Sequence, residues 1–244
     1  NYSLKDKNSK NIEFKDVSFT YPQTGIQVFN SFNLKIDKGT TLGIVGKVGS
    51  GKTTLLDLIC RVYDPNKGSI SYDRNDIKSF KINNLRELFS YVPQNNFLFS
   101  ESIFKNIQFG NPNATEREVK KAAKLSEIDS EIAKFENGYQ TILGERGVTL
   151  SGGQVQRVSI ARSFVKDSAL YLFDDCFSSL DTDTEERLIR NLKNNFKNKS
   201  VIIVSHRVSC VKHADKIIVL ENGKIIQEGI HKNLIEIDGY YKEL

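Results

Sequence analysis

Residues 46–54, GKVGSGKTT, constrain the fold of this chain more than any other segment. They stand directly after the apolar run TLGIV and directly before LLDLICRVY, which has the composition of a buried helix. The spacing fits G-x-x-x-x-G-K-[ST], which binds phosphate when it joins a strand to a helix. Its glycines allow consecutive backbone N–H groups to converge on one anion at the positive end of the helix. The segment therefore predicts a nucleotide-binding α/β protein.

Two side chains of this loop suit a bound nucleotide. Lys52 can reach the outer phosphates, and the hydroxyl of Thr53 can coordinate Mg²⁺. The alternative is an ordinary glycine turn, but this pattern arises by chance in only about one chain in a hundred of this length. We therefore expect the whole loop to bind phosphate: Gly46, Lys47, Val48, Gly49, Ser50, Gly51, Lys52, Thr53 and Thr54.

The spacing of apolar residues predicts a mostly parallel sheet covered by helices. The runs TLGIVG, ALYLF and SVIIVS are almost wholly apolar, as in strands that are buried on both faces. IEFKDVSFTY and FNLKI alternate apolar and polar residues, which predicts a half-exposed antiparallel sheet near the N-terminus. Thr115 and Glu118 have capping-box spacing, residues 182–196 fit a helix with early acids, and Asn222-Gly223 fits a hairpin tip. A helical insertion is expected around residues 95–156.

Composition favours one α/β domain with subdomains. The 244 residues are 39% apolar, and the net charge of +5 is scattered rather than blocked, so no nucleic-acid partner is expected. Three widely spaced cysteines without a C-x-x-C pair predict reduced thiols. No apolar run approaches the length of a spanning helix, which predicts a soluble domain. Residues 1–10 are polar and predict a linker, and residues 11–244 are expected to form the domain.

A second anion site is predicted at LSGGQVQR, residues 150–157, which precedes a helix. With this motif the chain, from about residue 11 to the end, resembles the ATP-binding cassette family, the nucleotide-binding domains of ABC transporters. The resemblance implies a RecA-like P-loop NTPase core, with ATP and Mg²⁺ as cofactors. It also implies that two such domains pair head to tail. Ser151, Gly152, Gly153 and Gln154 would then contact the ATP held by the other domain.

The resemblance also assigns roles to residues that look ordinary by themselves. Tyr21 would stack on adenine, although a tyrosine at a strand end usually packs. Gln94 would touch Mg²⁺ and sense a transmembrane domain, and Asp174, which ends a buried strand, would hold Mg²⁺ together with Thr53. Asp181 would lie in a loop that crosses the dimer interface, although it could simply cap a helix. His206 would contact the γ-phosphate and the attacking water, whereas lone histidines are more often structural.

Two segments resemble the exporter branch of the family. Residues 98–110, LFSESIFKNIQFG, are similar to one exporter pattern, and residues 141–154 are similar to the exporter loop T-E-V-G-E-R-G that precedes the signature. In that loop Ile142 and Leu143 replace the usual Glu and Val, while residues 144–147 retain G-E-R-G. The coupling contact of the missing acid is therefore not expected here.

Asp175 stands where the family typically has the glutamate that polarises the attacking water. Its side chain is one methylene shorter, which withdraws the carboxylate by roughly 1.5 Å, and such a misplacement can cost about a hundredfold in rate. A weakened acid beside an intact signature resembles one half of a heterodimeric bacterial multidrug exporter. His206 departs from the most degenerate members of that group, so a slow site is expected rather than an inactive one.

The sequence thus predicts an ATPase domain that drives a membrane exporter from the cytoplasmic face of the membrane. Its expected partners are a transmembrane domain on the same polypeptide and a second nucleotide-binding domain, identical or different. One alternative is a soluble ABC ATPase acting on nucleic acid or ribosomes, but no heptad repeats separate Lys52 from Ser151 as in the DNA-acting members. Another is a nucleotide sensor without turnover. The sequence does not identify the exported molecule.

Overall fold

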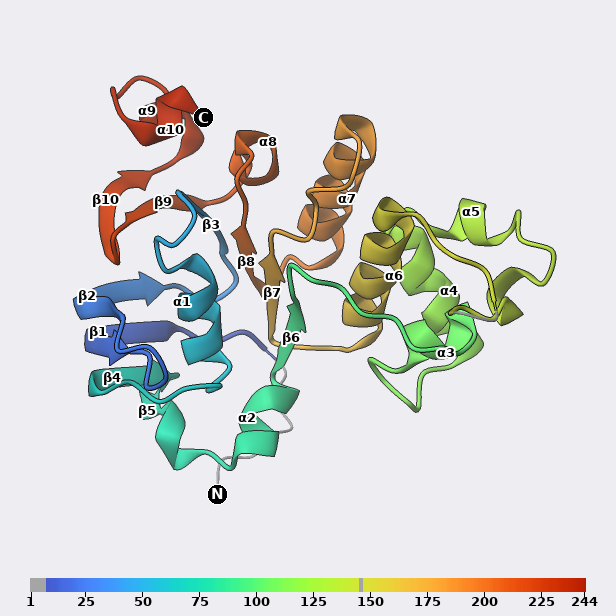
Figure 1. Cartoon of the computed structure of the whole chain (residues 1–244), viewed down its shortest axis with the longest axis horizontal. Coiled ribbons are helices and arrows are strands. Elements are labelled where there is room, and N and C mark those ends of the chain that lie inside the picture. The colour runs from blue at the N-terminus through green and yellow to red at the C-terminus, as the bar shows by residue number, and fades with distance from the viewer. Residues whose placement is uncertain (1–7, 145–146) are drawn as a thin grey trace. The chain divides into compact units, whose positions relative to one another are not determined.

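The computed structural model describes residues 8–144 and 147–244, which form two compact units (Figure 1). The first unit contains the described residues up to Ser90 together with Ser168–Asp175 and Asn198–Leu244. The second contains Tyr91–Asp167 and Cys176–Lys197. The predicted helical segment, residues 95–156, falls within the second unit.

An antiparallel sheet forms the N-terminal part of the first unit. Its order is β2 (Gln27–Ile36), β1 (Ile12–Thr20), β4 (Lys67–Tyr72) and β5 (Asn75–Asp76). Buried and exposed residues alternate along much of β1, and its buried side includes Phe14 and Phe19. The predicted half-exposed antiparallel sheet is therefore confirmed.

The second sheet holds the strands that were predicted to be buried. Its order is β10 (Lys224–Gly229), β9 (Lys216–Glu221), β3 (Thr41–Gly46), β8 (Ser200–Val204), β7 (Leu170–Asp174) and β6 (Phe89–Val92). Strand β3 pairs in parallel with β8 and β9, and β7 pairs in parallel with β8. Every residue of β7 and β8 is buried, as expected for strands covered on both faces.

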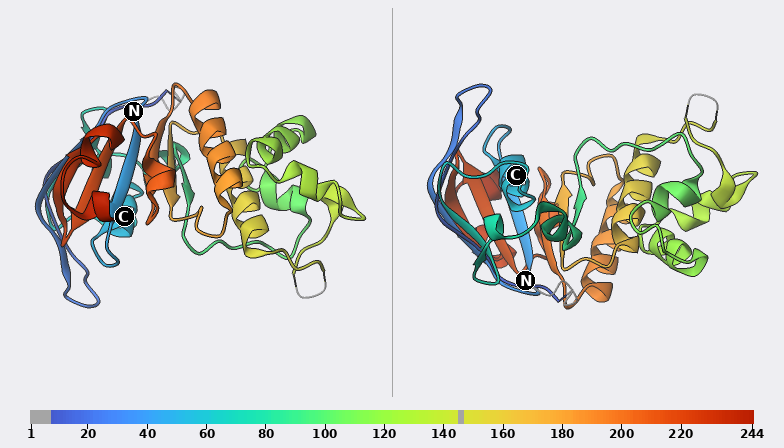
Figure 2. Two further views of the ribbon diagram at one scale, coloured as in Figure 1. Left: turned by 90° about the horizontal axis from the view of Figure 1, so that it is seen from above. Right: turned by 90° about the horizontal axis from the view of Figure 1, so that it is seen from below.

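Helix α1 (Lys52–Ile59) lies between the two sheets of the first unit (Figures 1 and 2). Leu55, Leu56 and Leu58 of α1 are fully buried, and all three join a single apolar core with residues of both sheets. The other helical elements of this unit are short: η1 (Ile77–Ser79), α2 (Ile82–Glu87), α8 (Val208–Val211), α9 (His231–Leu234) and α10 (Tyr240–Glu243). The core thus fixes the start of α1 against the end of β3.

The hairpin tip at Asn222-Gly223 is confirmed, and both residues have positive φ. A Cβ on Gly223 would lie 1.7 Å from the carbonyl oxygen of Val28. The N–H of Gly223 donates to the carbonyl of Ser50 at 3.2 Å. The tip of the β9–β10 hairpin therefore packs against the backbone of β2 and of the phosphate loop. Only glycine fits at this position.

Gly223→Ala is expected to lower the free energy of unfolding by about 2–4 kcal/mol, because strain at positive φ adds to the overlap with Val28. Gly25→Ala is the matched control, since Gly25 has φ 70° but a Cβ on it would meet nothing within 4 Å. That variant should lose only about 1 kcal/mol. Urea unfolding measures both, and equal losses would show that the contact with Val28 is unimportant.

The second unit is helical. Its elements are α3 (Ile103–Gln108), α4 (Glu116–Leu125), α5 (Asp129–Ile132), η2 (Gly138–Gln140), α6 (Gly152–Val165) and α7 (Thr182–Asn195). Helix α6 packs against α3 and α4 (Figures 1 and 2). The predicted capping box of Thr115 and Glu118 is confirmed at the start of α4. The predicted helix from residue 182 is α7, which buries Leu188 and Leu192.

Three predictions concern the chain end, the thiols and the membrane. Residues 1–7 of the predicted linker lie outside the described residues, whereas the Ser9 hydroxyl donates to the carbonyl of Asn198 at 3.0 Å. The three cysteines are buried thiols. Within residues 8–144 and 147–244, no helix has both the length and the apolar character that crossing a bilayer requires.

Candidate functional site

The phosphate loop joins the end of β3 to the start of α1, as its sequence predicts. Gly46, Gly49 and Gly51 have φ of 152°, 80° and 105°, values that side-chain-bearing residues rarely adopt. A Cβ on Gly46 would lie 2.2 Å from the carbonyl oxygen of Leu220 in β9. The glycines therefore provide both the turn and the close approach of the neighbouring strand.

Lys52 is the first residue of α1, and its side chain turns back to the loop. Its ammonium donates to the carbonyls of Gly46 at 2.7 Å and Lys47 at 2.8 Å, and the residue is only 7% exposed. Burial lowers the pKa of Lys52, while the charges of Asp174 and Asp175 oppose that shift. The positive charge of Lys52 thus interacts with the carboxylates of both Asp174 and Asp175.

The strand register brings the catalytic candidates of the first unit to one edge of the sheet. Ile44 of β3 and Asp174 of β7 are both aligned with Val204 of β8. The N–H of Asp175 donates to the carbonyl of Val204 at 2.9 Å, and His206 follows two residues later. Since the carboxyl ends of parallel strands form the ligand edge of such sheets, these residues suit a shared site with the phosphate loop.

The first unit carries oxygen donors that would hold a divalent cation beside a bound nucleotide. Asp174 is 2% exposed. The burial of Asp57 in α1 and, to a smaller extent, the charge of Asp174 raise the pKa of Asp57 to about 6. Asp57 is partly buried, and a cation bound near the two carboxyl groups would favour their ionised forms. The Asp174 carboxylate and the Thr53 hydroxyl are hard oxygen donors, which Mg²⁺ prefers. Mg²⁺ bound there with ATP would neutralise charge that develops on the phosphates.

Tyr21, the predicted adenine contact, is tied to the phosphate-loop helix. Its hydroxyl forms a hydrogen bond of 2.8 Å with that of Thr54. Its ring meets those of Phe19 and Tyr63 edge to face, with centroids 5.0 and 5.4 Å apart. Tyr21 therefore has a packing role in the described structure, and adenine stacking stays a prediction.

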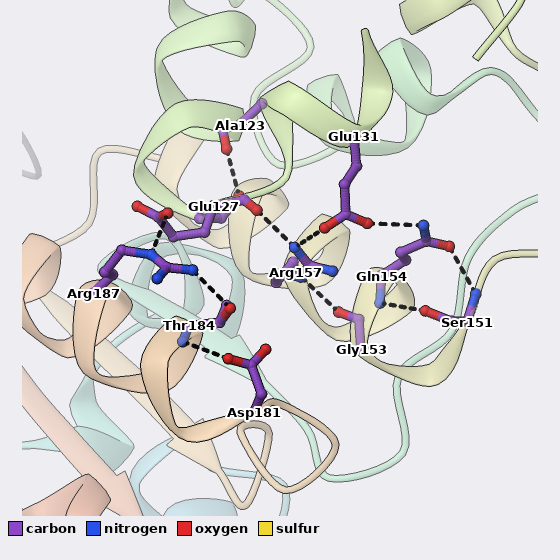
Figure 3. A network of polar contacts seen from close by, with 11 residues as sticks. Ala123, Glu127, Glu131, Ser151, Gly153, Gln154, Arg157, Asp181, Thr184 and Arg187 are labelled. Carbon is purple, nitrogen blue, oxygen red and sulfur yellow. Dashed lines mark hydrogen bonds and ion pairs between the residues drawn. The ribbon is translucent and has the colours of Figure 1, made fainter. Parts of the chain in front are cut away.

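The signature residues open α6 in the second unit, and Figure 3 shows their polar contacts. The Ser151 hydroxyl accepts from the N–H of Gln154 at 3.3 Å, and the N–H of Ser151 donates to Oε1 of Gln154 at 2.8 Å. This is a capping box that the sequence analysis did not predict, although S-x-x-Q could have indicated it. A Cβ on Gly153 would lie 3.1 Å from the carbonyl oxygen of Ser179. The lack of a side chain at Gly153 thus allows the loop of residues 178–181 to lie close to the start of α6.

Asp181 caps α7 in the described structure. Its carboxylate accepts from the N–H of Thr184 at 2.9 Å, and that hydrogen bond holds the pKa of Asp181 below its usual value. The alternative role as a helix cap is therefore observed, and contact across a dimer remains a prediction. The buried side chain of Gln156 links α6 to the same loop, because it bonds Ser178 at 3.2 Å and Ser179 at 3.0 Å. Sequence reasoning missed Gln156.

Gln94 is exposed in the second unit, two residues after β6 ends. The segment that follows it carries aromatic side chains: Phe97 and Phe109 are 65% and 60% exposed. The Arg162 guanidinium of α6 lies 5.4 Å from the ring centroid of Phe99 and donates to the carbonyl of Phe97 at 2.9 Å. In the exporter loop, residues 145–146 lie outside the described residues.

The structure therefore gathers the predicted site residues in two groups. The first unit holds the phosphate loop, Tyr21, Asp174, Asp175 and His206. The second holds Gln94, the signature residues and Asp181. The first group lies at the phosphate loop and the carboxyl ends of the parallel strands, and the signature residues of the second group form a capped helix start.

Comparisons with known proteins identify the family of the chain. Residues 29–178 match the family model described as ABC transporter. The chain is 39% identical over 237 residues to a probable multidrug resistance ABC transporter ATP-binding/permease protein of Bacillus subtilis, covering 97% of this chain and 40% of that protein. It is 40% identical over 235 residues to an ATP-dependent lipid A-core flippase of Desulfotalea psychrophila, covering 96% and 41%.

A solved structure extends the likeness to the fold. The structure of a bacterial Atm1-family ABC exporter with ATP bound matches with a TM-score of 0.91 and 36% identity, over 97% of this chain and 41% of that chain. The chain thus spans about two fifths of the length of these relatives. Because the family match covers the phosphate loop, the signature and both acids, the chain belongs to the ABC transporter family as an ATPase domain of the exporter type.

Proposed function

We propose that this chain binds and hydrolyses ATP to drive an exporter whose membrane part lies on the same polypeptide. The observation that carries the proposal is the alignment of the phosphate loop, Asp174, Asp175 and His206 at one edge of the parallel sheet. There Lys52 and the loop N–H groups bind the phosphates, and Thr53 and Asp174 would hold Mg²⁺. Asp175 accepts a proton from the attacking water, and His206 orients that water against the γ-phosphate.

A second copy or a related domain completes the nucleotide site. Ser151, Gly152, Gly153 and Gln154 of one domain close on the ATP held by the phosphate loop of the other, and Asp181 lies in the same contact. A capped helix start with further backbone N–H donors is suited to a phosphate. Bound ATP then holds the two domains together, and its hydrolysis allows them to separate.

The transmembrane partner docks on the second unit. The relatives that the chain matches include proteins named as combined ATP-binding and permease proteins. The exposed aromatic segment after Gln94 supports this proposal, since it borders a pocket of about 400 Å³ lined by Phe99, Phe109 and Pro112. Exposed aromatic surface on a single domain is typical of a protein contact. The domain would lie on the cytoplasmic face of the membrane, where ATP is available.

The nucleotide site of this chain is the slower of two unequal sites. Asp175 has a shorter reach than the glutamate usual in the family, and it follows β7 in a left-handed conformation with φ 46°. The signature, in contrast, is intact and capped. A heterodimer explains this combination, because a strong signature serves the partner's site while the shorter acid limits this one.

Ser151→Arg tests the contact across the dimer. The bulky cation should block closure on the partner's nucleotide, so turnover of the assembled transporter should fall at least about tenfold. ATP binding by the isolated chain should be unchanged, as measured by thermal shift with Mg-ATP. If binding by the isolated chain fell equally, the signature would belong to its own site. Unchanged turnover would contradict pairing through this loop.

A further inference from the structure

Glu131 of α5 joins two residues of the signature helix, as Figure 3 shows. One carboxylate oxygen accepts from Nε2 of Gln154 at 2.9 Å, and the other accepts from the guanidinium of Arg157. The two partners stand three positions apart on α6, so they occupy the same face of the helix. A single carboxylate thus bridges neighbouring turns of α6 from outside that helix.

The bond to Glu131 selects one orientation of the Gln154 amide. Oε1 of this amide accepts from the N–H of Ser151, so Nε2 must point the other way, to an acceptor. Glu131 supplies that acceptor. If the amide turned over, its NH₂ group would face the N–H of Ser151, donor against donor. The cap on the signature serine therefore depends on a residue 20 positions before it in the chain.

The two capping boxes of the second unit show why such a partner is needed. At the start of α4, Glu118 closes the box, and one of its oxygens accepts both the N–H and the hydroxyl of Thr115 at 2.7 Å. Both oxygens of a carboxylate are acceptors, so that box needs no orienting residue. At the start of α6 the same place is taken by Gln154, whose amide is half donor and half acceptor.

Arg157 extends the restraint to the signature backbone. Its Nε donates to the carbonyl of Gly153 at 3.2 Å, and Nη1 donates to the carbonyl of Glu127 at 2.7 Å in addition to Glu131. The side chain of Arg157 is only 11% exposed, which limits its alternative partners. Through Gln154 and Arg157, Glu131 therefore holds both Ser151 and Gly153.

We propose that Glu131 is a positioning residue for ATP hydrolysis. It orients the Gln154 amide and the Arg157 guanidinium, and through them it holds Ser151 and Gly153 in the geometry that completes the partner's nucleotide site. This inference rests on the proposed pairing of signature and phosphate loop across a dimer. Glu131 touches no nucleotide itself, so its effect should appear in how well ATP closes the pair.

Glu131→Gln is the sharpest single test, because it keeps the shape and replaces one acceptor by a donor. Whichever way the new amide turns, either Gln154 or Arg157 then faces a donor. We expect the KM for ATP of the full exporter to rise about tenfold, the usual scale for a charged hydrogen bond, while kcat changes little. Glu136→Gln is the matched control, since Glu136 is an exposed acid shortly after the end of α5.

A reciprocal exchange tests the orientation itself. In the variant with Glu131→Gln and Gln154→Glu together, the carboxylate at 154 accepts from both Ser151 and the amide at 131, whose oxygen accepts from Arg157. Every bond of the network is then present again, and only the bond between positions 131 and 154 has its donor and acceptor exchanged. All kcat/KM values are expressed relative to the wild type. The value of the double variant should then be about tenfold higher than the product of the values of the two single variants. A charge effect of Gln154→Glu alone cancels in this comparison.

The outcomes separate this inference from others. A wild-type KM in Glu131→Gln, or a double variant no better than the product, overturns it. A lower kcat at unchanged KM with a lower melting temperature of the exporter indicates a merely structural role and also overturns it. Failure of the proposed pairing appears differently, as full turnover in Ser151→Arg, whereas failure of the positioning role leaves the loss of turnover in Ser151→Arg unchanged.

Discussion

Lys52→Ala is expected to abolish stabilisation of the chain by Mg-ATP and to reduce turnover by at least about a hundredfold. The reason is the place of the ammonium, which is buried in the phosphate loop and held by the carbonyls of Gly46 and Lys47. Within residues 46–54, no other side chain brings a buried positive charge to the outer phosphates. Thermal unfolding with and without Mg-ATP measures the effect, since a ligand at a hundred times its Kd adds about 2.7 kcal/mol to wild-type stability.

Lys67→Ala is the control for this change. Lys67 is an exposed lysine at the start of β4 in the same unit, so it tests for loss of charge without loss of the site. Its thermal shift with Mg-ATP should equal that of the wild type. If Lys52→Ala kept the full shift as well, nucleotide binding by this loop would be refuted, and with it the proposed function.

Asp175→Glu is expected to raise hydrolysis at this chain's own site by about 10- to 100-fold, because one further methylene restores the reach of the general base. The measurement is ATPase activity of the full complex in which the partner's own catalytic glutamate has been replaced, so that only this site contributes. The backbone should tolerate the change, since Glu127 already adopts a left-handed conformation in this chain, with φ 60°.

Asp175→Asn provides the complementary comparison in the complex with an intact partner. Asparagine keeps the length of aspartate and suits the same left-handed backbone, but it accepts no proton. Total turnover should change little, because in an unequal pair most of the flux passes through the partner's site. If wild-type Asp175 is as fast as the glutamate variant when it alone reports, the two sites are equal. An ordinary symmetric dimer would then replace the unequal pair.

Several features of the fold were predictable because their causes are local. The phosphate loop is recognisable because glycine spacing, Lys52 and the start of α1 all lie within one short segment. The buried strands β7 and β8 are recognisable because helices on both faces require continuous apolar residues. The capping box of Thr115 and Glu118 and the tip at Asn222-Gly223 follow from side chains that satisfy backbone groups a few residues away.

The contacts around the signature were not predictable in this way. Gln156 bonds the backbone of Ser179, and Glu131 bonds Gln154, across 23 residues of chain in each case. A glutamine or glutamate on a helix surface usually faces solvent, and no local pattern distinguishes one that bonds a distant loop. For Asp181 the helix cap that sequence reasoning kept as an alternative is observed, while its contact across a dimer stays a prediction.

The sequence by itself determined that this protein is an ATPase domain with a phosphate loop, a signature and a shortened acid, because these depend on residue type and spacing along the chain. Only the tertiary structure decided which side chains hold those motifs in place. Hydrogen bonds are short and directional, so Glu131, Gln154 and Arg157 can act together only after α5 and α6 have packed. That packing follows from the burial of apolar faces throughout the second unit, a property of the whole unit that no single motif encodes.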